Sequence, residues 1–420
     1  MSITAPNTFT KSWNTTASSI EGILLQFPGR VYVNQDPYLK ATARVEITSN
    51  SQAVLDLIAF NATQAVGNVI SVGCNRHVAL AQSNQTYLNV SATSDVDAYA
   101  VGSLLVRVTV QRAVSWIKST ADTVLVSGSL VNGANKAVSI AALGTGNITT
   151  TAKYPVTLSN LTLSTTGAGS VQFAATTNLN VTNGLSLLIV GSGSVALQAA
   201  RDITVRRLQT SVAGSGSVFA LANGSLKAQN VRTSLAGKGN VSYSTPQGST
   251  INNTISATGS GHVYSGSLFA QNATVTLAGS GDVVVQVIDT LTAIATGEGK
   301  VLYYNKTGNP AHLPERKGWW VFSSPSAEAI GVNPTDQFTL APEPLKEPVN
   351  VRIELNASSL SHCVVQTFKS GGQVSLAASG AQSPVDVATL GGIAVAFLML
   401  IALVMFKKQK RVAGYVALPK

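Results

Sequence analysis

Charged residues are scarce in this chain, and so are aromatic ones: they make up 11% and 6% of its 420 residues. So few aromatic side chains exclude a fold held by one large aromatic core, and stability must come from many modest contacts and backbone ladders. With two cysteines and no CxxC spacing, the sequence also excludes a multi-disulfide framework and a structural zinc site. We therefore expect no metal and no cofactor.

The two cysteines, Cys74 and Cys363, leave one question open. In an oxidising compartment they could form a disulfide that joins the N-terminal region to the C-terminal one. Pairing depends on a distance that the sequence does not give, so two unpaired thiols are the alternative.

Long apolar runs are absent except for residues 387–406, which carry no charge and are long enough to cross a bilayer as a helix. Four basic residues follow directly: Lys407, Lys408, Lys410 and Arg411. Under the positive-inside rule this cluster stays in the cytosol, so the lipid bilayer is one expected partner. The arrangement predicts a single-pass plasma-membrane protein with the preceding residues outside the cell.

The formal charge of +10 is no sign of a nucleic-acid partner. Five of the 28 basic residues and none of the 18 acidic ones lie in residues 407–420, so the rest of the chain carries only +5. We expect no nucleic-acid binding, because the excess charge is explained by membrane topology.

What the sequence does have is a repeat of the form Gly-x-Gly-polar-Val/Ile, present eight times at intervals of 18 to 24 residues. A period near 20 residues is typical of a solenoid, in which each supersecondary unit stacks on copies of itself. Apolar residues alternate on both sides of each glycine pair, as at Val171 and Phe173, which indicates β-strands. A third apolar cluster lies midway between pairs, so the sequence predicts three short strands per coil.

The glycines themselves are interpreted as corner residues, since a β-carbon there would strain the turn or collide with the adjacent coil. A dinucleotide site is excluded because no copy extends to Gly-x-Gly-x-x-Gly before a helix. The predicted structural glycines are Gly144, Gly146, Gly167, Gly169, Gly191, Gly193, Gly214, Gly216, Gly237, Gly239, Gly259, Gly261, Gly279, Gly281, Gly297 and Gly299.

Asn-x-Ser/Thr sequons support an extracellular location for the repeats, if the host performs N-glycosylation. The candidate acceptors are Asn14, Asn61, Asn84, Asn89, Asn147, Asn160, Asn180, Asn223, Asn240, Asn252, Asn272, Asn305 and Asn356.

The start of the chain, Met1–Thr16, does not have the basic and apolar stretches of a signal peptide. We expect that a signal peptide precedes the sequence given. The alternative is a tail-anchored protein whose C-terminal helix alone enters the membrane, which would leave the solenoid in the cytosol.

Seven regions follow from these patterns. They are a polar N-terminal segment (1–20), β-rich first coils or cap (21–143), the regular Gly-x-Gly solenoid (144–305), a Pro-rich cap or stalk (306–369), a Gly/Ser/Ala linker (370–386), the transmembrane helix (387–406) and a basic cytosolic tail (407–420). Within the tail, Tyr415 and Leu418 form a Tyr-x-x-Leu pattern of the type that sorting adaptors bind.

The repeats resemble the head GIN domain family, described as putative autotransporter adhesins. The resemblance rests on GSGSV at Gly191 and Gly214, GSGHV at Gly259, GSGDV at Gly279 and the N-terminal run GILLQFPGRVYV, and it covers about residues 20–305. It implies a right-handed, single-stranded parallel β-helix on the cell envelope or secreted, with no catalytic residues to carry over.

The expected function is therefore non-enzymatic: an adhesin-like ectodomain for adhesion, with wall or matrix polysaccharide or another surface protein as partner. A carbohydrate-processing β-helix enzyme is the first alternative, because Asp282 and Glu298 lie at similar corners of adjacent coils and His262 precedes Asp282 by one coil. Solvated corner carboxylates explain the same residues. The tail-anchored cytosolic scaffold is the second alternative.

Overall fold

The computed structural model describes residues 8–17, 19–64, 69–72, 76–79, 86–92, 98–304, 308–314, 327–334, 336, 338–355 and 366–367. In these ranges the fold is all-β, as predicted, with one short helix, α1 (Gln52–Asp56). No helix there is long and apolar enough to span a membrane. The helix predicted for residues 387–406 lies outside the described residues.

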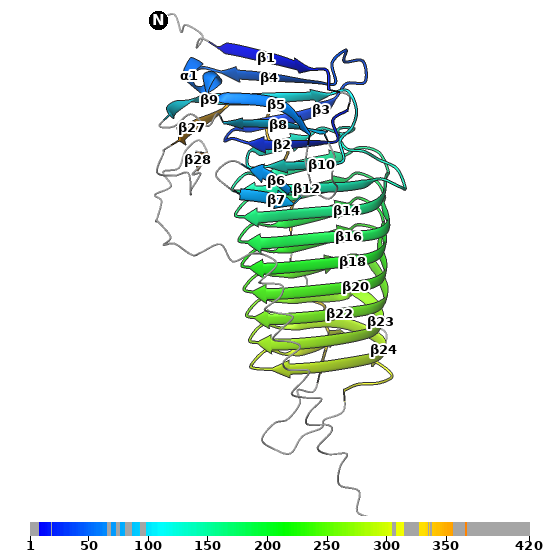
Figure 1. The fold of residues 1–420 in the computed structure, drawn as a ribbon. Helices are drawn as coiled ribbons and strands as arrows, with labels where there is room; N and C mark the ends of the chain where they lie inside the picture. The colour runs from blue at the N-terminus through cyan, green and yellow to red at the C-terminus, as the bar shows by residue number, and fades with distance from the viewer. Residues whose placement is uncertain are drawn as a thin grey trace, which may run out of the picture. The chain divides into compact units, whose positions relative to one another are not determined.

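A β-solenoid of about nine turns forms most of the described chain (Figure 1). Long strands end at the first glycine of each pair: β12 (Ala137–Gly144), β14 (Val156–Gly167), β16 (Leu179–Gly191), β18 (Ile203–Gly214), β20 (Ser225–Gly237) and β22 (Gln247–Gly259). Short strands follow the pair: β13 (Ile148–Ala152), β15 (Val171–Ala175), β17 (Val195–Ala199), β19 (Val218–Ala222), β21 (Val241–Ser244) and β25 (Val301–Tyr304). β11 (Asp122–Leu125) pairs with β13 and has the same place in the preceding coil, which has no glycine pair. In β23 (Val263–Gly279) and β24 (Val283–Thr296) the two segments are continuous.

The number of strands per turn differs from the prediction of three. Alternation of buried and exposed residues in β16 breaks at Thr182 and Asn183, which are both exposed, and the pairing with β18 shifts between Val181 and Gly184. The chain bends there, but the parallel ladder resumes at once. The second and third apolar clusters of a turn therefore lie on one long, bent strand.

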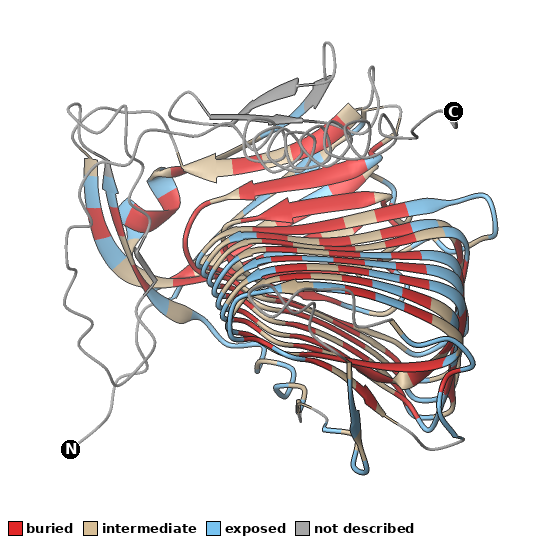
Figure 2. Ribbon diagram, turned by 90° about the horizontal axis from the view of Figure 1, so that it is seen from below, coloured by how far each residue is buried: buried red, intermediate tan, exposed pale blue. Residues whose placement is uncertain are grey.

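Inward side chains of all turns form one continuous buried cluster, visible as aligned bands of buried residues in Figure 2. Most are Val, Leu, Ile and Ala, but Tyr243 is fully buried beside the small Ala220 of the preceding short strand. Its hydroxyl lies 2.8 Å from Oγ1 of both Thr210 and Thr233. Burial raises the pKa of Tyr243 to about 12, so the phenol stays neutral inside the solenoid.

Parallel stacking continues from the repeats into the N-terminal region. β2 (Gly22–Gln26) lies between β8 (Thr86–Ala92) and β10 (Trp116–Ser119), and β3 (Arg30–Gln35) lies between β9 (Ala98–Val110) and β11. Antiparallel strands then cover this end: β1 (Phe9–Thr15) pairs with β4 (Ala43–Ser49), β4 with β9, and β5 (Ile58–Gln64) with β8. A separate hairpin joins β6 (Val69–Val72) and β7 (Arg76–Ala79). The switch to antiparallel pairing ends the coil repeat and supplies a cap.

The chain after the last coil turns back along the solenoid. β26 (Glu328–Ile330) pairs with β25, and the described residues 331–334, 336 and 338–348, which we call the strap, then pass successively earlier coils. They lead to β27 (Val349–Leu355), which pairs antiparallel with β9; β28 (Gln366–Thr367) pairs with β27. The sequence predicts a Pro-rich cap or stalk at 306–369. In the described part of this region, the strap lies against the solenoid and β27 lies against the N-terminal cap.

Candidate interaction surfaces

The first glycine of each pair occupies a left-handed backbone conformation. From Gly144 to Gly297 the φ angles of these eight residues lie between 87° and 141°, a region that side-chain-bearing residues rarely adopt. Stacking adds a second constraint, because a β-carbon on Gly214 would lie 2.2 Å from the carbonyl oxygen of Gly191. The corner geometry therefore requires glycine at this position.

The second glycine of each pair is constrained by close approach alone. No positive φ occurs at these residues, but a β-carbon on Gly239 would lie 1.7 Å from the carbonyl oxygen of Gly216. In the first pair, Gly146 faces the backbone of Thr120 and Ala121 in the same way. The two columns of glycine thus let successive coils touch backbone to backbone at the corner.

The polar residue after each pair builds a hydrogen-bond ladder along the same corner. Its side chain accepts a hydrogen bond from the backbone N–H of the equivalent residue one coil on: Ser170 N to Asn147 Oδ1 at 3.1 Å, for example, and His262 N to Asn240 Oδ1 at 3.1 Å. The bonds of this kind form two runs, one through Asp122, Asn147, Ser170 and Ser194 and the other through Ser217, Asn240, His262, Asp282 and Lys300. Asp122 has the equivalent place in the coil before the first glycine pair. We call this the corner ladder, and it explains why the fourth motif position is polar.

Two residues of the enzyme alternative belong to the corner ladder. His262 accepts the backbone N–H of Asp282 through Nδ1 at 3.0 Å, and Asp282 Oδ1 accepts the backbone N–H of Lys300 at 2.9 Å. Glu298 is exposed and sits between the two glycines of its pair, not at the ladder position. The carboxylates thus differ in place and role, and in the described ranges no cluster of His, Cys, Asp and Glu could hold a metal ion.

The strap lies against the outward face of the short strands. Asn333 Nδ2 donates to Ser267 Oγ at 3.2 Å, Asn240 Nδ2 donates to Asp336 Oδ2 at 3.3 Å, and Ala341 N donates to Gln172 Oε1 at 2.9 Å. At the N-terminal cap the Tyr32 hydroxyl donates to the carbonyl oxygen of Pro344, and Arg30 Nη1 donates to that of Leu345 at 2.8 Å. Four prolines, at 334, 342, 344 and 348, remove backbone donors and keep the strap extended without making it a ladder strand.

An aromatic contact joins the strap to the middle of the solenoid. Phe219 and Tyr264 lie in one outward column, separated by Ser242 one coil from each. Phe338 of the strap stacks on Phe219 with ring centroids 4.4 Å apart. A cavity of about 230 Å³ remains beside this pair, lined also by Ser242 and Asp336. The aromatic residues are therefore covered in part by the chain itself and do not form an open ligand strip.

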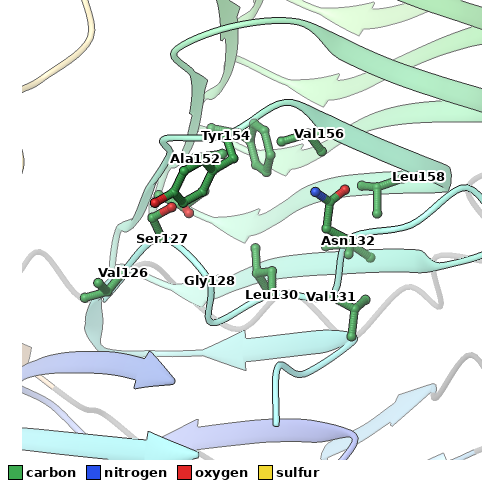
Figure 3. Close-up of a pocket in the computed structure, with 13 residues that line it drawn as sticks. Val126, Ser127, Gly128, Leu130, Val131, Asn132, Ala152, Tyr154, Val156 and Leu158 are labelled. Carbon is green, nitrogen blue, oxygen red and sulfur yellow. The ribbon is translucent and has the colours of Figure 1, made fainter. Parts of the chain in front are cut away.

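A second, apolar pocket of about 90 Å³ opens where the irregular loop after β11 meets the regular array. Figure 3 shows Leu130 and Val131 from this loop facing Tyr154 and Val156, which lie between β13 and the start of β14. An engineered cavity of about 150 Å³ holds benzene, so this pocket accommodates only a few heavy atoms. Its position indicates a packing gap between an irregular coil and a regular one.

The candidate glycan acceptors fall into two groups in the structure. Asn14, Asn61, Asn160, Asn180, Asn223 and Asn252 are exposed, whereas Asn89, Asn147, Asn240 and Asn272 are half-buried. Asn147 and Asn240 use both amide atoms in contacts: each oxygen accepts a corner-ladder bond, Asn147 Nδ2 donates to Asp122 Oδ1 at 3.2 Å, and Asn240 Nδ2 donates to Asp336 of the strap. An asparagine at the polar position of the motif can thus match a sequon while its side-chain amide forms hydrogen bonds within the fold.

Several predicted residues lie outside the described part of the chain. They are Cys74, Cys363, Asn84, Asn305, Asn356, Tyr415 and Leu418. The disulfide, the corresponding glycan sites and the sorting pattern stay predictions. The corner ladder was not predicted from the sequence, although the recurring polar residue in the motif was a signal for it. The strap was not predicted either, because proline content does not show where a segment packs.

Several solved structures are similar to this chain at low sequence identity. A putative lipid binding protein from Parabacteroides distasonis is 14% identical with a TM-score of 0.37; the match covers 71% of this chain and 96% of that one. A putative adhesin from the same organism is 14% identical with a TM-score of 0.39, covering 71% and 97%, and one from Parabacteroides merdae is 12% identical with a TM-score of 0.37, covering 70% and 95%. Comparison with curated proteins gives no match.

The family comparison agrees with the repeat motif. The resemblance seen in the sequence extends over about residues 20–305, whereas the family match starts later, within the bent strand β16, and includes the glycine pairs from Gly191 to Gly299. Residues 184–307 of this chain match the family described as putative auto-transporter adhesin, head GIN domain.

Proposed function

We propose that this protein is a non-enzymatic, single-pass cell-surface protein whose β-solenoid ectodomain mediates adhesion or contact with cell wall or matrix. The observation that carries the proposal is the outward face of the long strands. Polar residues such as Thr204, Gln209 and Ser234 occupy it on successive turns, held at the β spacing by the core beneath. Such a face offers many equivalent hydrogen-bonding positions to an extended partner.

The family match and the chemistry of the corners support this function over the enzyme alternative. The family is described as adhesin, and Asp282 is occupied in the corner ladder away from Glu298. A glycosidase requires two carboxyl groups held on either side of one bond. We therefore expect that neither the unsubstituted chain nor the double variant Asp282→Asn/Glu298→Gln depolymerises any polysaccharide. Depolymerisation that disappears in the double variant would establish the enzyme instead.

Location is tested on the full chain in its own cells. If the solenoid is extracellular, N-glycosidase treatment should lower the apparent mass by several glycans, and protease added to intact cells should remove the solenoid while sparing a small C-terminal fragment. No mass shift in a host that N-glycosylates, together with protection from the protease, would favour the tail-anchored cytosolic scaffold. Adhesion is then compared between cells with and without the protein.

A further inference from the structure

Four exposed basic side chains gather at one bend of the solenoid. Arg206 and Arg207 lie at the bend of β18, and Lys227 and Arg232 lie on either side of the same bend in β20. The register places Thr204 beside Lys227, Arg207 beside Asn230 and Gln209 beside Arg232. We call these four residues the basic bend.

The basic bend has little acidic compensation. No salt bridge within 4.0 Å joins any of its side chains to the described residues. Asp202 is the acidic group nearest in sequence, and it is engaged: its Oδ1 accepts both the backbone N–H and the hydroxyl of Ser225 at 2.7 Å. These hydrogen bonds, with the charge of Lys227, lower the pKa of Asp202. Asp202 therefore stays ionised and offsets part of the charge, but four basic side chains against this one carboxylate leave the patch positive.

The same bend in the neighbouring coils is uncharged. One coil earlier it carries Thr182 and Asn183, and one coil later Ile251 and Asn252. The charge is therefore local to two adjacent strands and is not a general property of the solenoid. Positive charges concentrated in this way attract an anionic partner, and arginine in particular binds carboxylate and sulfate groups in a bidentate manner.

We propose that the basic bend binds an acidic polysaccharide, one that carries carboxylate or sulfate groups along its length. This inference rests on the proposed extracellular function and names the partner class for it. Hydrogen-bonding side chains surround the cations: Thr204, Gln209, Gln229, Asn230 and Ser234 all face outward. These side chains can form hydrogen bonds with the hydroxyl groups of a sugar chain, whereas a simple inorganic ion would leave most of them unused.

A polymer strand fits this site better than a membrane surface does. Candidate glycan acceptors lie on either side of the basic bend: Asn180 precedes it by one coil in the column of Thr204, and Asn252 follows it by one coil in the column of Asn230. Glycans there keep a flat bilayer away but leave a path for a linear chain. Only one large apolar side chain, Ile251, is exposed beside the bend, whereas surface-binding segments insert several apolar groups.

The test uses the purified full chain on immobilised heparin and polygalacturonate. The variant Arg206→Gln/Arg207→Gln/Lys227→Gln/Arg232→Gln removes the patch, and Arg107→Gln/Arg112→Gln/Lys136→Gln/Lys153→Gln removes the same charge from exposed positions in earlier coils. We expect the patch variant to bind at least one of the two polymers about tenfold or more weakly than the unsubstituted chain. The reason is that it loses four ion pairs between its basic side chains and the anionic groups of the polymer. The control variant should bind within about twofold of it, and salt should weaken binding.

Three results would overturn the proposal. They are equal losses in both variants, no binding of either polymer by the unsubstituted chain, and patch-dependent binding to phosphatidylserine vesicles that matches or exceeds binding to the polymers. Circular dichroism confirms that both variants fold, as surface changes of this kind should allow. Because the binding assay uses purified protein, a negative result in it does not bear on the cellular location test of the proposed function. A negative location test likewise does not decide whether the purified chain binds the polymers.

Discussion

The ring of Phe338 stacks on the ring of Phe219 with a centroid distance of 4.4 Å and an angle of 19° between their planes. One residue belongs to the strap and the other to β19, in the middle of the solenoid. This contact is an apolar attachment of the strap midway between the last coil and the N-terminal cap.

Replacing Phe338 by Ala should therefore loosen the strap without unfolding the coils. An aromatic pair contributes about 0.5–1.5 kcal/mol beyond its buried area, so local opening should become roughly tenfold more frequent. Hydrogen exchange would show faster exchange in the strap, with unchanged protection in β16 to β20. Leu345→Ala is a control, because the Leu345 side chain is 70% exposed. Loss of protection throughout the coils would contradict a separate strap.

Glycine substitutions should separate corner positions from ordinary ones. Gly239→Ala places a methyl group against the carbonyl oxygen of Gly216 and should cost more than about 3 kcal/mol, at the high end for single substitutions. Gly184→Ala is the matched control, since its β-carbon would meet only the side chain of Asn160, at 3.2 Å, and its φ is not positive. Thermal unfolding followed by circular dichroism measures the difference. Equal melting temperatures for the two variants would contradict the backbone contact.

Chain position 262 tests the corner ladder. His262→Ala leaves the backbone N–H of Asp282 without its acceptor and should cost about 1 kcal/mol. His262→Asn should lose much less, because Asn240 one coil earlier already fills the equivalent place with its amide oxygen. Denaturant unfolding of the two variants measures this. If the two variants lose the same free energy of unfolding, the His262 side chain does not stabilise the fold through the ladder hydrogen bond.

High pH should destabilise the solenoid through Tyr243. Burial raises its folded pKa to about 12, above the ordinary tyrosine pKa of about 10, so the unfolded chain releases this proton first, and stability falls as pH rises between those two values. The maximum loss is about 2–3 kcal/mol at 1.36 kcal/mol per unit. Tyr243→Phe should lose about 1–2 kcal/mol at neutral pH, from two hydrogen bonds, but should show a weaker decline above pH 10. A parallel decline in both proteins would contradict this assignment.

Glycan occupancy should follow the geometry of the acceptor amides. On an extracellular solenoid, we expect modification at the exposed Asn180 and Asn223, and not at Asn147 and Asn240, whose amide nitrogens donate to Asp122 and to Asp336 of the strap. A glycan at either ladder position would have to displace these contacts. Mass spectrometry of glycopeptides from the native protein measures occupancy at each site. Full occupancy of Asn147 in the folded protein would contradict the ladder geometry.

The sequence predicted those features that depend on local repetition. The Gly-x-Gly period and the alternation at Val171 and Phe173 were enough for the stacked coils, because each coil repeats the same local constraints. It did not predict that β27 pairs with β9 or that Phe338 reaches Phe219, since each is a single contact between distant segments with no period to reveal it. The basic bend is a similar case: Arg206 and Lys227 are 21 positions apart in the sequence, and only coil stacking places them on neighbouring strands.

The pairing of β27 with β9 closes the described chain into a loop, down the coils and back along the strap. Mechanical tension applied to the chain beyond Thr367 therefore acts first on the two residue pairs between β28 and β27, then on the seven residue pairs between β27 and β9, and not on the last coil. The coils can stay stacked while these two ladders carry the force into the N-terminal cap. For a protein that holds a surface against shear, such a path would let the attachment yield reversibly before the solenoid unravels.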